Sequence, residues 1–179
     1  MSGAVLARSI GIGDVAVVPA CPVTRSEGMY GNDALAAVIP EDGKFTFRPG
    51  GVGFVDDDGA LGIKLAWDRR RPGDLFVGGR RLDASAPPAR SYIPTGYGEV
   101  GGQSTYLVFP TPGCWEITGR VSDAGLTFVV LVEKIGDGPS WRMHGPQPGW
   151  RLTTGCSGPE LNKVPSIVTG QCPAAEPGR

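Results

Sequence analysis

The sequence has little histidine, few cysteines and no long apolar run. Its 179 residues include 1 His and 4 Cys, and no two of the cysteines form a Cys-x-x-Cys pair. Without that spacing, four cysteines and one histidine do not make a zinc site. No run approaches the roughly 18 consecutive apolar residues that a membrane helix needs. We therefore predict no metal site and no transmembrane segment.

Charge of one sign and helical periodicity are also lacking. Lys and Arg number 17 against 18 Asp and Glu, which gives a formal net charge of −1. This balance does not favour a nucleic acid as partner. No stretch of useful length has the period of an amphipathic helix. The glycine pairs lack the third glycine and the following helix of a phosphate-binding loop. No cofactor is predicted.

Glycine and proline, in contrast, are abundant. The 29 Gly and 17 Pro fall between short apolar runs, as is typical of an all-β domain with many turns. Several of these runs read as strands, namely 35–39, 44–48, 52–55, 61–67 and 75–77. Gly78 and Gly79 are predicted to bend or bulge the last of them. Strands at this spacing favour an immunoglobulin-like antiparallel β-sandwich.

The clearest strand pair lies within residues 106–135. Trp115, Ile117 and Val121 share one parity, which is the pattern of a half-buried strand. A turn is predicted at 122–125. Residues 126–132 are then apolar on both parities, which indicates a strand covered on both faces, or nearly so, in the middle of a sandwich.

We predict three segments. Residues 1–20 form an N-terminal segment, 21–136 form the β-sandwich, and 137–179 form an extended tail rich in proline and glycine. Residues 9–21 partly resemble a lipoprotein signal, but Asp14 and Pro19 interrupt its pattern. Whether Cys21 is lipidated or disulfide-bonded stays open at this point.

Four cysteines allow three pairings. We predict Cys21–Cys114, because the start of the domain and the start of a late strand can meet at one pole of a sandwich. Cys114 should then face away from the core, toward a terminal segment. The other pair, Cys156–Cys172, would clasp the tail. Disulfides persist in oxidising compartments, so they favour an extracytoplasmic location. Four free thiols in a cytosolic protein are the alternative.

Several short motifs carry a resemblance to a known group of proteins. They are Cys-Pro-Val-Thr at 21–24, Gly-Arg-Arg-Leu-Asp at 79–83, Gly-Tyr-Gly at 96–98 and the run Phe-Pro-Thr-Pro-Gly-Cys-Trp-Glu-Ile-Thr-Gly at 109–119. Over about residues 21–134 the chain resembles an uncharacterised domain of bacterial secreted proteins and lipoproteins. The resemblance implies an exported immunoglobulin-like sandwich and implies no activity.

Basic and aromatic residues suggest one candidate binding site. If both arginine groups meet at one end of the sandwich, they would bind an anionic or sugar-like ligand. The candidate residues are Arg69, Arg70, Arg71, Arg80 and Arg81, together with Trp67 and Tyr97. The alternative is a set of solvated arginines offset by Asp68, Asp74 and Asp83.

Catalytic groups are sparse. His144, the single histidine, lies in the predicted tail, and no catalytic residue is predicted. Asp56, Asp57 and Asp58 resemble half of a calcium loop, or form a hydrated turn. We therefore predict a non-catalytic extracytoplasmic binding or structural module. Its partner would be an unknown protein, a cell-envelope component or a glycan. The alternative is an enzyme or inhibitor with a site assembled from loops.

Overall fold

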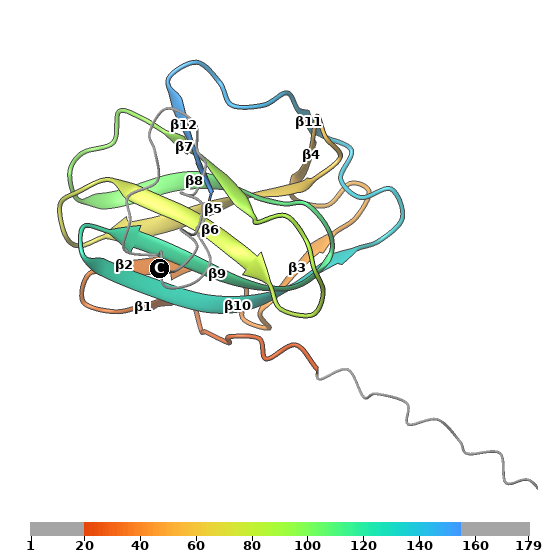
Figure 1. Ribbon diagram of the computed structural model, residues 1–179, viewed down its shortest axis with the longest axis horizontal. Coiled ribbons are helices and arrows are strands. Elements are labelled where there is room, and N and C mark those ends of the chain that lie inside the picture. The colour runs from red at the N-terminus through yellow and green to blue at the C-terminus, as the bar shows by residue number, and fades with distance from the viewer. Residues whose placement is uncertain (1–19, 155–179) are drawn as a thin grey trace, which may run out of the picture.

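A computed structural model describes residues 20–154 of the chain, and these residues form two facing β-sheets (Figure 1). The strands are β1 (Met29–Gly31), β2 (Leu35–Val38), β3 (Lys44–Phe47), β4 (Phe54–Asp56), β5 (Leu61–Arg69), β6 (Leu75–Arg81), β7 (Arg90–Pro94), β8 (Gly101–Phe109), β9 (Gly113–Val121), β10 (Ala124–Lys134), β11 (Arg142–Met143) and β12 (Trp150–Thr154). Within this described part no helix could span a membrane. The prediction of an all-β fold is confirmed.

The two sheets differ in size and order. Sheet A runs β1-β2-β5-β8-β7-β12, with β4 paired to β5 and β11 paired to β4. Sheet B runs β3-β10-β9-β6. Two of the strand pairs, β3–β10 and β4–β11, are parallel. The sandwich is therefore not purely antiparallel as predicted. In each of these two pairs the strands are far apart in sequence. No local turn signal could therefore predict the pairing.

The core between the sheets follows the predicted parity. Trp115, Ile117 and Val121 of β9 are fully buried. The hairpin turn is shorter than predicted, because Val121 already pairs with Ala124. Strand β10 lies between β3 and β9 in sheet B. Only one of its faces is fully buried, and the other is half-buried or exposed, so the predicted cover on both faces is incomplete.

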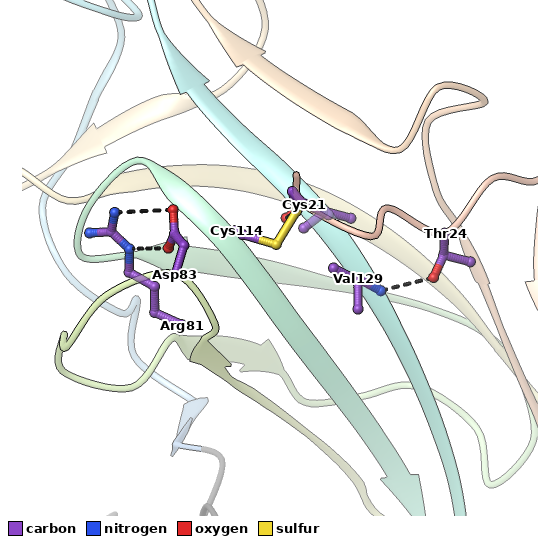
Figure 2. The surroundings of a disulfide bond; sticks show 7 residues. Cys21, Thr24, Arg81, Asp83, Cys114 and Val129 are labelled. Atoms are coloured by element: carbon purple, nitrogen blue, oxygen red, sulfur yellow. Dashed lines mark hydrogen bonds and ion pairs between the residues drawn. A yellow bond between two sulfur atoms is a disulfide. The ribbon is translucent and has the colours of Figure 1, made fainter. Parts of the chain in front are cut away.

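The N-terminal segment lies along the edge of β10, on the same side as β3. The Thr24 N–H donates to the Val129 carbonyl at 2.8 Å. In return, the Val129 N–H donates to the Thr24 hydroxyl at 2.9 Å (Figure 2). Residues 21–24 therefore run beside β10 and are held there by its backbone.

The Cys21–Cys114 disulfide fixes this segment to sheet B and confirms the predicted pairing (Figure 2). The two Cα atoms are 5.5 Å apart. Cys114 alternates with inward-facing Trp115 along β9 and is buried beneath the N-terminal segment. A cysteine on the outer parity is thus shielded by the chain that it binds. The predicted pair Cys156–Cys172 lies outside the described residues.

Part of the predicted tail returns to the sandwich. Residues 142–143 pair with β4, and residues 150–154 pair with β7 at the edge of sheet A. The predicted domain boundary at 136 therefore lies inside the folded unit. These strands were missed because glycine and proline separate Trp141, Met143 and Trp150 into very short apolar groups. The rest of the predicted tail lies outside the described residues.

The outer edge of β6 is closed by side chains and by a single bridge. The Val77 N–H donates to the Thr153 hydroxyl at 3.3 Å, and that hydroxyl donates to the Val77 carbonyl at 2.7 Å. Gly79 makes an isolated bridge with Ala89. Unpaired edges of sheets invite association with other chains. Thr153 therefore serves as a short substitute for a neighbouring strand.

Replacing Thr153 by Val should lower the free energy of unfolding by about 1–3 kcal/mol, because two buried polar groups of Val77 lose their partner. Urea unfolding measures this as a lower midpoint at constant slope. Thr127→Val is the matched control, since the Thr127 hydroxyl pairs with Thr118 on the exposed face of sheet B. The control should change stability by no more than about 0.5 kcal/mol. Equal effects of the two variants would contradict the proposed edge closure.

Candidate binding face

The structure does not bring the seven predicted site residues together. Arg69 ends β5, and Arg70 and Arg71 follow it in the turn that leads to β6. Arg80 and Arg81 lie at the far end of β6, which is seven residues long. At about 3.3 Å per residue, the two arginine groups are separated by about 20 Å along the strand.

Two of the predicted residues have structural roles. Trp67 is 1% exposed and packs in the core, where its indole N–H donates to the Thr105 hydroxyl at 3.1 Å. Arg69 is buried as well and donates to the carbonyls of Gly73 and Gly98. It therefore joins the β5–β6 turn to the β7–β8 loop. Tyr97 lies exposed in that loop.

The other four arginines are each paired with a carboxylate. The pairs are Arg70–Asp68 at 3.0 Å, Arg71–Asp123 at 3.5 Å, Arg80–Glu116 at 2.7 Å and Arg81–Asp83 at 2.6 Å. The hydrogen bond from Arg81 lowers the pKa of Asp83, against a smaller opposing effect of burial. An anionic ligand would have to compete with these carboxylates, so this surface offers no open cluster of positive charge.

A different set of residues converges on the outer face of sheet A. They form a second hydrophobic cluster that is separate from the main core: Phe54, Ala60, Tyr92, Val108 and Met143, with Tyr106 and Trp150 packed against them. Tyr92 and Tyr106 are directly paired across β7 and β8. Residues 141–150 cross this face between β11 and β12. We call this surface the binding face.

Four aromatic rings on the binding face form a continuous series, the aromatic row. The ring centroids are 5.3 Å apart for Trp141–Phe54, 6.0 Å for Phe54–Tyr106 and 4.7 Å for Tyr106–Trp150. The last two rings are stacked with an interplanar angle of 13°. Phe54 covers Gly62, where an added Cβ would meet its ring at 1.9 Å. The glycine thereby leaves room for the far end of the Phe54 ring.

The ends of the row differ from its centre in exposure. Phe54 is fully buried, Tyr106 and Trp150 are half-buried, and Trp141 is 55% exposed. Among the described residues, the indole N–H groups of Trp141 and Trp150 have no protein acceptor, whereas Trp67 and Trp115 each have one. The chain therefore has two tryptophans built into its core and two presented at the binding face.

A buried carboxylate anchors one end of the face. Asp56 accepts hydrogen bonds from the Tyr92 hydroxyl at 2.5 Å and from Arg90 at 2.8 Å. The Gly145 N–H donates to its other oxygen at 3.3 Å. Burial by itself raises the pKa of Asp56, but the hydrogen bonds from Tyr92 and Arg90 outweigh it and the pKa is lowered. Burial and the hydrogen bond to Asp56 raise the pKa of Tyr92.

The neighbouring acids form a braced turn. Asp58 accepts from Arg90 at 2.8 Å, so one guanidinium bridges Asp58 and Asp56. Asp57 lies 2.7 Å from the Nδ1 atom of His144. The described residues contain no group of three or more His, Cys, Asp or Glu arranged to hold a metal ion. In this turn the positive charge beside the carboxylates comes from Arg90.

The contacts of His144 give it no catalytic partner beyond Asp57. Both side chains of the pair are mostly exposed, at 80% and 62%. A Ser/His/Asp triad requires a nucleophile within hydrogen-bond reach of the histidine. The residues described here place none in contact with His144. The pair therefore joins the turn between β4 and β5 to the 141–150 segment.

The Asp56 network makes a prediction about acid stability. Asp56→Asn should lower the free energy of unfolding by about 1.5–3 kcal/mol at neutral pH, because charge-assisted hydrogen bonds are lost. The folded pKa lies below the ordinary value of 3.8. The stabilisation is therefore complete above the unfolded pKa and is lost as the pH falls through the folded pKa. Urea unfolding at pH 7 and at pH 3 should show the two proteins converging at the lower pH. A constant difference would contradict this assignment.

The aromatic row was not found from the sequence because its rings come from four separate elements. Phe54, Tyr106, Trp141 and Trp150 lie on β4, on β8, just ahead of β11 and at the start of β12. The one available signal was the pair of tryptophans in a segment otherwise poor in apolar residues. Comparisons with protein-family models, with curated proteins and with solved structures found no match.

Proposed function

We propose that this protein is a non-catalytic, extracytoplasmic binding module that acts through the binding face on sheet A. The observation that carries the proposal is the aromatic row, in which Trp141 is exposed at one end. Trp141 is held above Phe54 with more than half of its surface in solvent. Exposed aromatic residues, fixed by their neighbours, are typical of surfaces that recognise a partner.

Export from the cytoplasm is supported by the disulfide. Cys21 and Cys114 are bonded, and Cys114 is buried beneath the N-terminal segment. Structural disulfides are typical of oxidising compartments and rare in the cytosol. The resemblance to domains of bacterial secreted proteins and lipoproteins is in keeping with this location.

The immunoglobulin-like type of the sandwich is also a proposal, and the strand order supports it. Immunoglobulin constant-type domains have strands A-B-E-D in one sheet and C-F-G in the other. If β2, β5, β6, β7, β8, β9 and β10 are taken as A to G, sheet A contains β2-β5-β8-β7 and sheet B contains β6-β9-β10. The remaining strands β1, β3, β4, β11 and β12 are additions to this arrangement, and the disulfide lies outside the core between the sheets.

His144→Ala should leave the proposed function and the fold intact, because the side chain is mostly exposed and contacts one exposed carboxylate. Thermal unfolding should shift by no more than a few degrees. Chromogenic ester, glycoside and phosphate substrates should show no turnover by either protein. Turnover by the wild type that disappears in the variant would establish the alternative, an enzyme with a loop-assembled site.

Binding itself is tested by sedimentation with bacterial cell-envelope preparations. The wild-type protein should sediment with the envelope, and Trp141→Ala should lose most of that association. Tyr97→Ala is the matched control, because Tyr97 is an exposed aromatic residue in the β7–β8 loop, outside the aromatic row. Association that is equally strong in all three proteins would mean that binding uses another surface. No association with any envelope preparation would contradict the proposed function.

A further inference from the structure

We infer that the binding face takes an uncharged oligosaccharide, laid along the aromatic row. The inference rests on the proposed function and specifies its ligand. Sugar rings present flat faces of C–H groups edged by hydroxyls. Such a ligand needs flat apolar surfaces in the site, flanked by fixed hydrogen-bonding groups. The binding face supplies both.

The rings of the row are fixed before any ligand arrives. Tyr106 and Trp150 are stacked almost parallel, and Tyr106 also packs edge-to-face on Phe54. Phe54 in turn packs edge-to-face on Trp141. Side chains that are already ordered lose little conformational entropy on binding. Trp141 is exposed at one end of the row, Trp150 is half-buried at the other end, and buried Phe54 lies between them. The site therefore suits a chain of several sugars rather than a single one.

The charges of the face favour a ligand without net charge. Lys64 is directly paired with Tyr106 across β5 and β8 and is exposed beside it. Arg90 is bonded to Asp56 and Asp58. Against these two cations stand Asp56, Asp57 and Asp58, so the face carries charges of both signs with a small acidic excess. A strongly acidic polymer would meet the exposed carboxylates of Asp57 and Asp58, and a strongly basic one would meet Lys64 and Arg90.

The hydrogen-bonding groups beside the row distinguish a sugar from a proline-rich peptide, which also docks on aromatic surfaces. Asp57 and Asp58 are 62% and 56% exposed, and beside their contacts with His144 and Arg90 their carboxylates have room to accept further hydrogen bonds. A polyproline segment has carbonyls but no backbone N–H to donate. Sugar hydroxyls donate as well as accept. A face edged by carboxylates therefore matches a ligand rich in donors.

Affinity electrophoresis in gels containing xylan, mannan, mixed-linkage β-glucan, alginate or dextran sulfate tests this inference. At least one neutral polysaccharide should retard the wild-type protein, and neither anionic polymer should. Titration calorimetry with fragments of the retarding polysaccharide should show binding by oligosaccharides and not by the monosaccharide. Trp141→Ala and Trp150→Ala should each weaken binding at least tenfold, and Tyr97→Ala should leave it unchanged. Thermal unfolding of each variant establishes that it is folded.

The outcomes separate the ligand from the function. If no neutral polysaccharide retards the protein but the envelope still sediments it through Trp141, the oligosaccharide inference is overturned and the proposed function stands. If Trp141→Ala binds the polysaccharide as tightly as the wild type, the inference is overturned as well, because Trp141 is exposed and its loss does not threaten the fold. Binding of a polyproline peptide that depends on Trp141, without polysaccharide binding, would assign the face to peptide recognition.

Discussion

Loss of the Cys21–Cys114 disulfide should lower the free energy of unfolding by about 4–5 kcal/mol. The bond joins residues 93 apart in sequence, and closing a loop of that length restricts the unfolded chain by about this amount. Whole domains are stable by only roughly 5–15 kcal/mol. Cys114→Ser should therefore leave a protein that is marginally folded at room temperature. Urea unfolding of the oxidised wild type and of the variant measures the difference.

The controls for this prediction use reduction. Dithiothreitol should destabilise the wild type to about the level of Cys114→Ser. The same treatment of Cys114→Ser should have a much smaller effect, because the bridge that closes the long loop is already absent. Peptide mapping without reduction should recover Cys21 bonded to Cys114. A variant as stable as the oxidised wild type would show that the bond does not stabilise the fold.

Trp67→Ala should have the second large effect, a loss of about 3–5 kcal/mol of unfolding free energy. Its ring is 1% exposed and packs against Phe128, with centroids 6.0 Å apart. Gly119 makes room for it, since a Cβ there would meet the ring at 2.4 Å. Truncation would leave a cavity between the sheets and remove the donor to Thr105.

Trp141→Ala is the matched comparison, because it removes the same side chain from the binding face. Trp141 is 55% exposed, so its loss should change stability by no more than about 1 kcal/mol. Thermal unfolding of both variants measures the contrast. If the two variants lost similar stability, the division of the tryptophans into core and surface residues would be wrong. Trp67→Ala that folds normally but loses ligand binding would instead restore Trp67 as a binding residue.

The sequence predicted the strands that have strong local signals. The alternation of Trp115, Ile117 and Val121 identified β9, and the apolar run at 126–132 identified the strand β10, although only one face of β10 is fully buried. The predicted bend at Gly78 and Gly79 is absent, because β6 pairs with β9 through both glycines. Gly79 lies too close to the Ile117 side chain for a Cβ to fit, at 2.5 Å. From the sequence alone, a glycine that is needed for close packing cannot be distinguished from a glycine that is needed for a turn.

The candidate site was harder to predict, because it depends on contacts between distant residues. The arginines of residues 69–71 and 80–81 form clusters in the sequence, and the offsetting acids Asp68 and Asp83 could be named from the same local pattern. The partners that come from distant strands could not. Arg80, for example, is paired with Glu116, 36 residues away. The binding face has the opposite character. Its rings are isolated in sequence and become one surface only when 141–150 crosses sheet A.

The disulfide also decides how the domain responds to mechanical load. When the chain is pulled from a point ahead of Cys21 and a point after Cys114, tension passes through the sulfur–sulfur bond and bypasses the residues between. Strands β1 to β8 lie within that bypassed loop. Roughly 300 Å of extended chain therefore stays out of the path of the force. While the bond is intact, only β9 to β12 among the described strands can be pulled out of the fold. Reduction of the bond would let β1 to β8 unfold under load as well, and the chain could then extend much further.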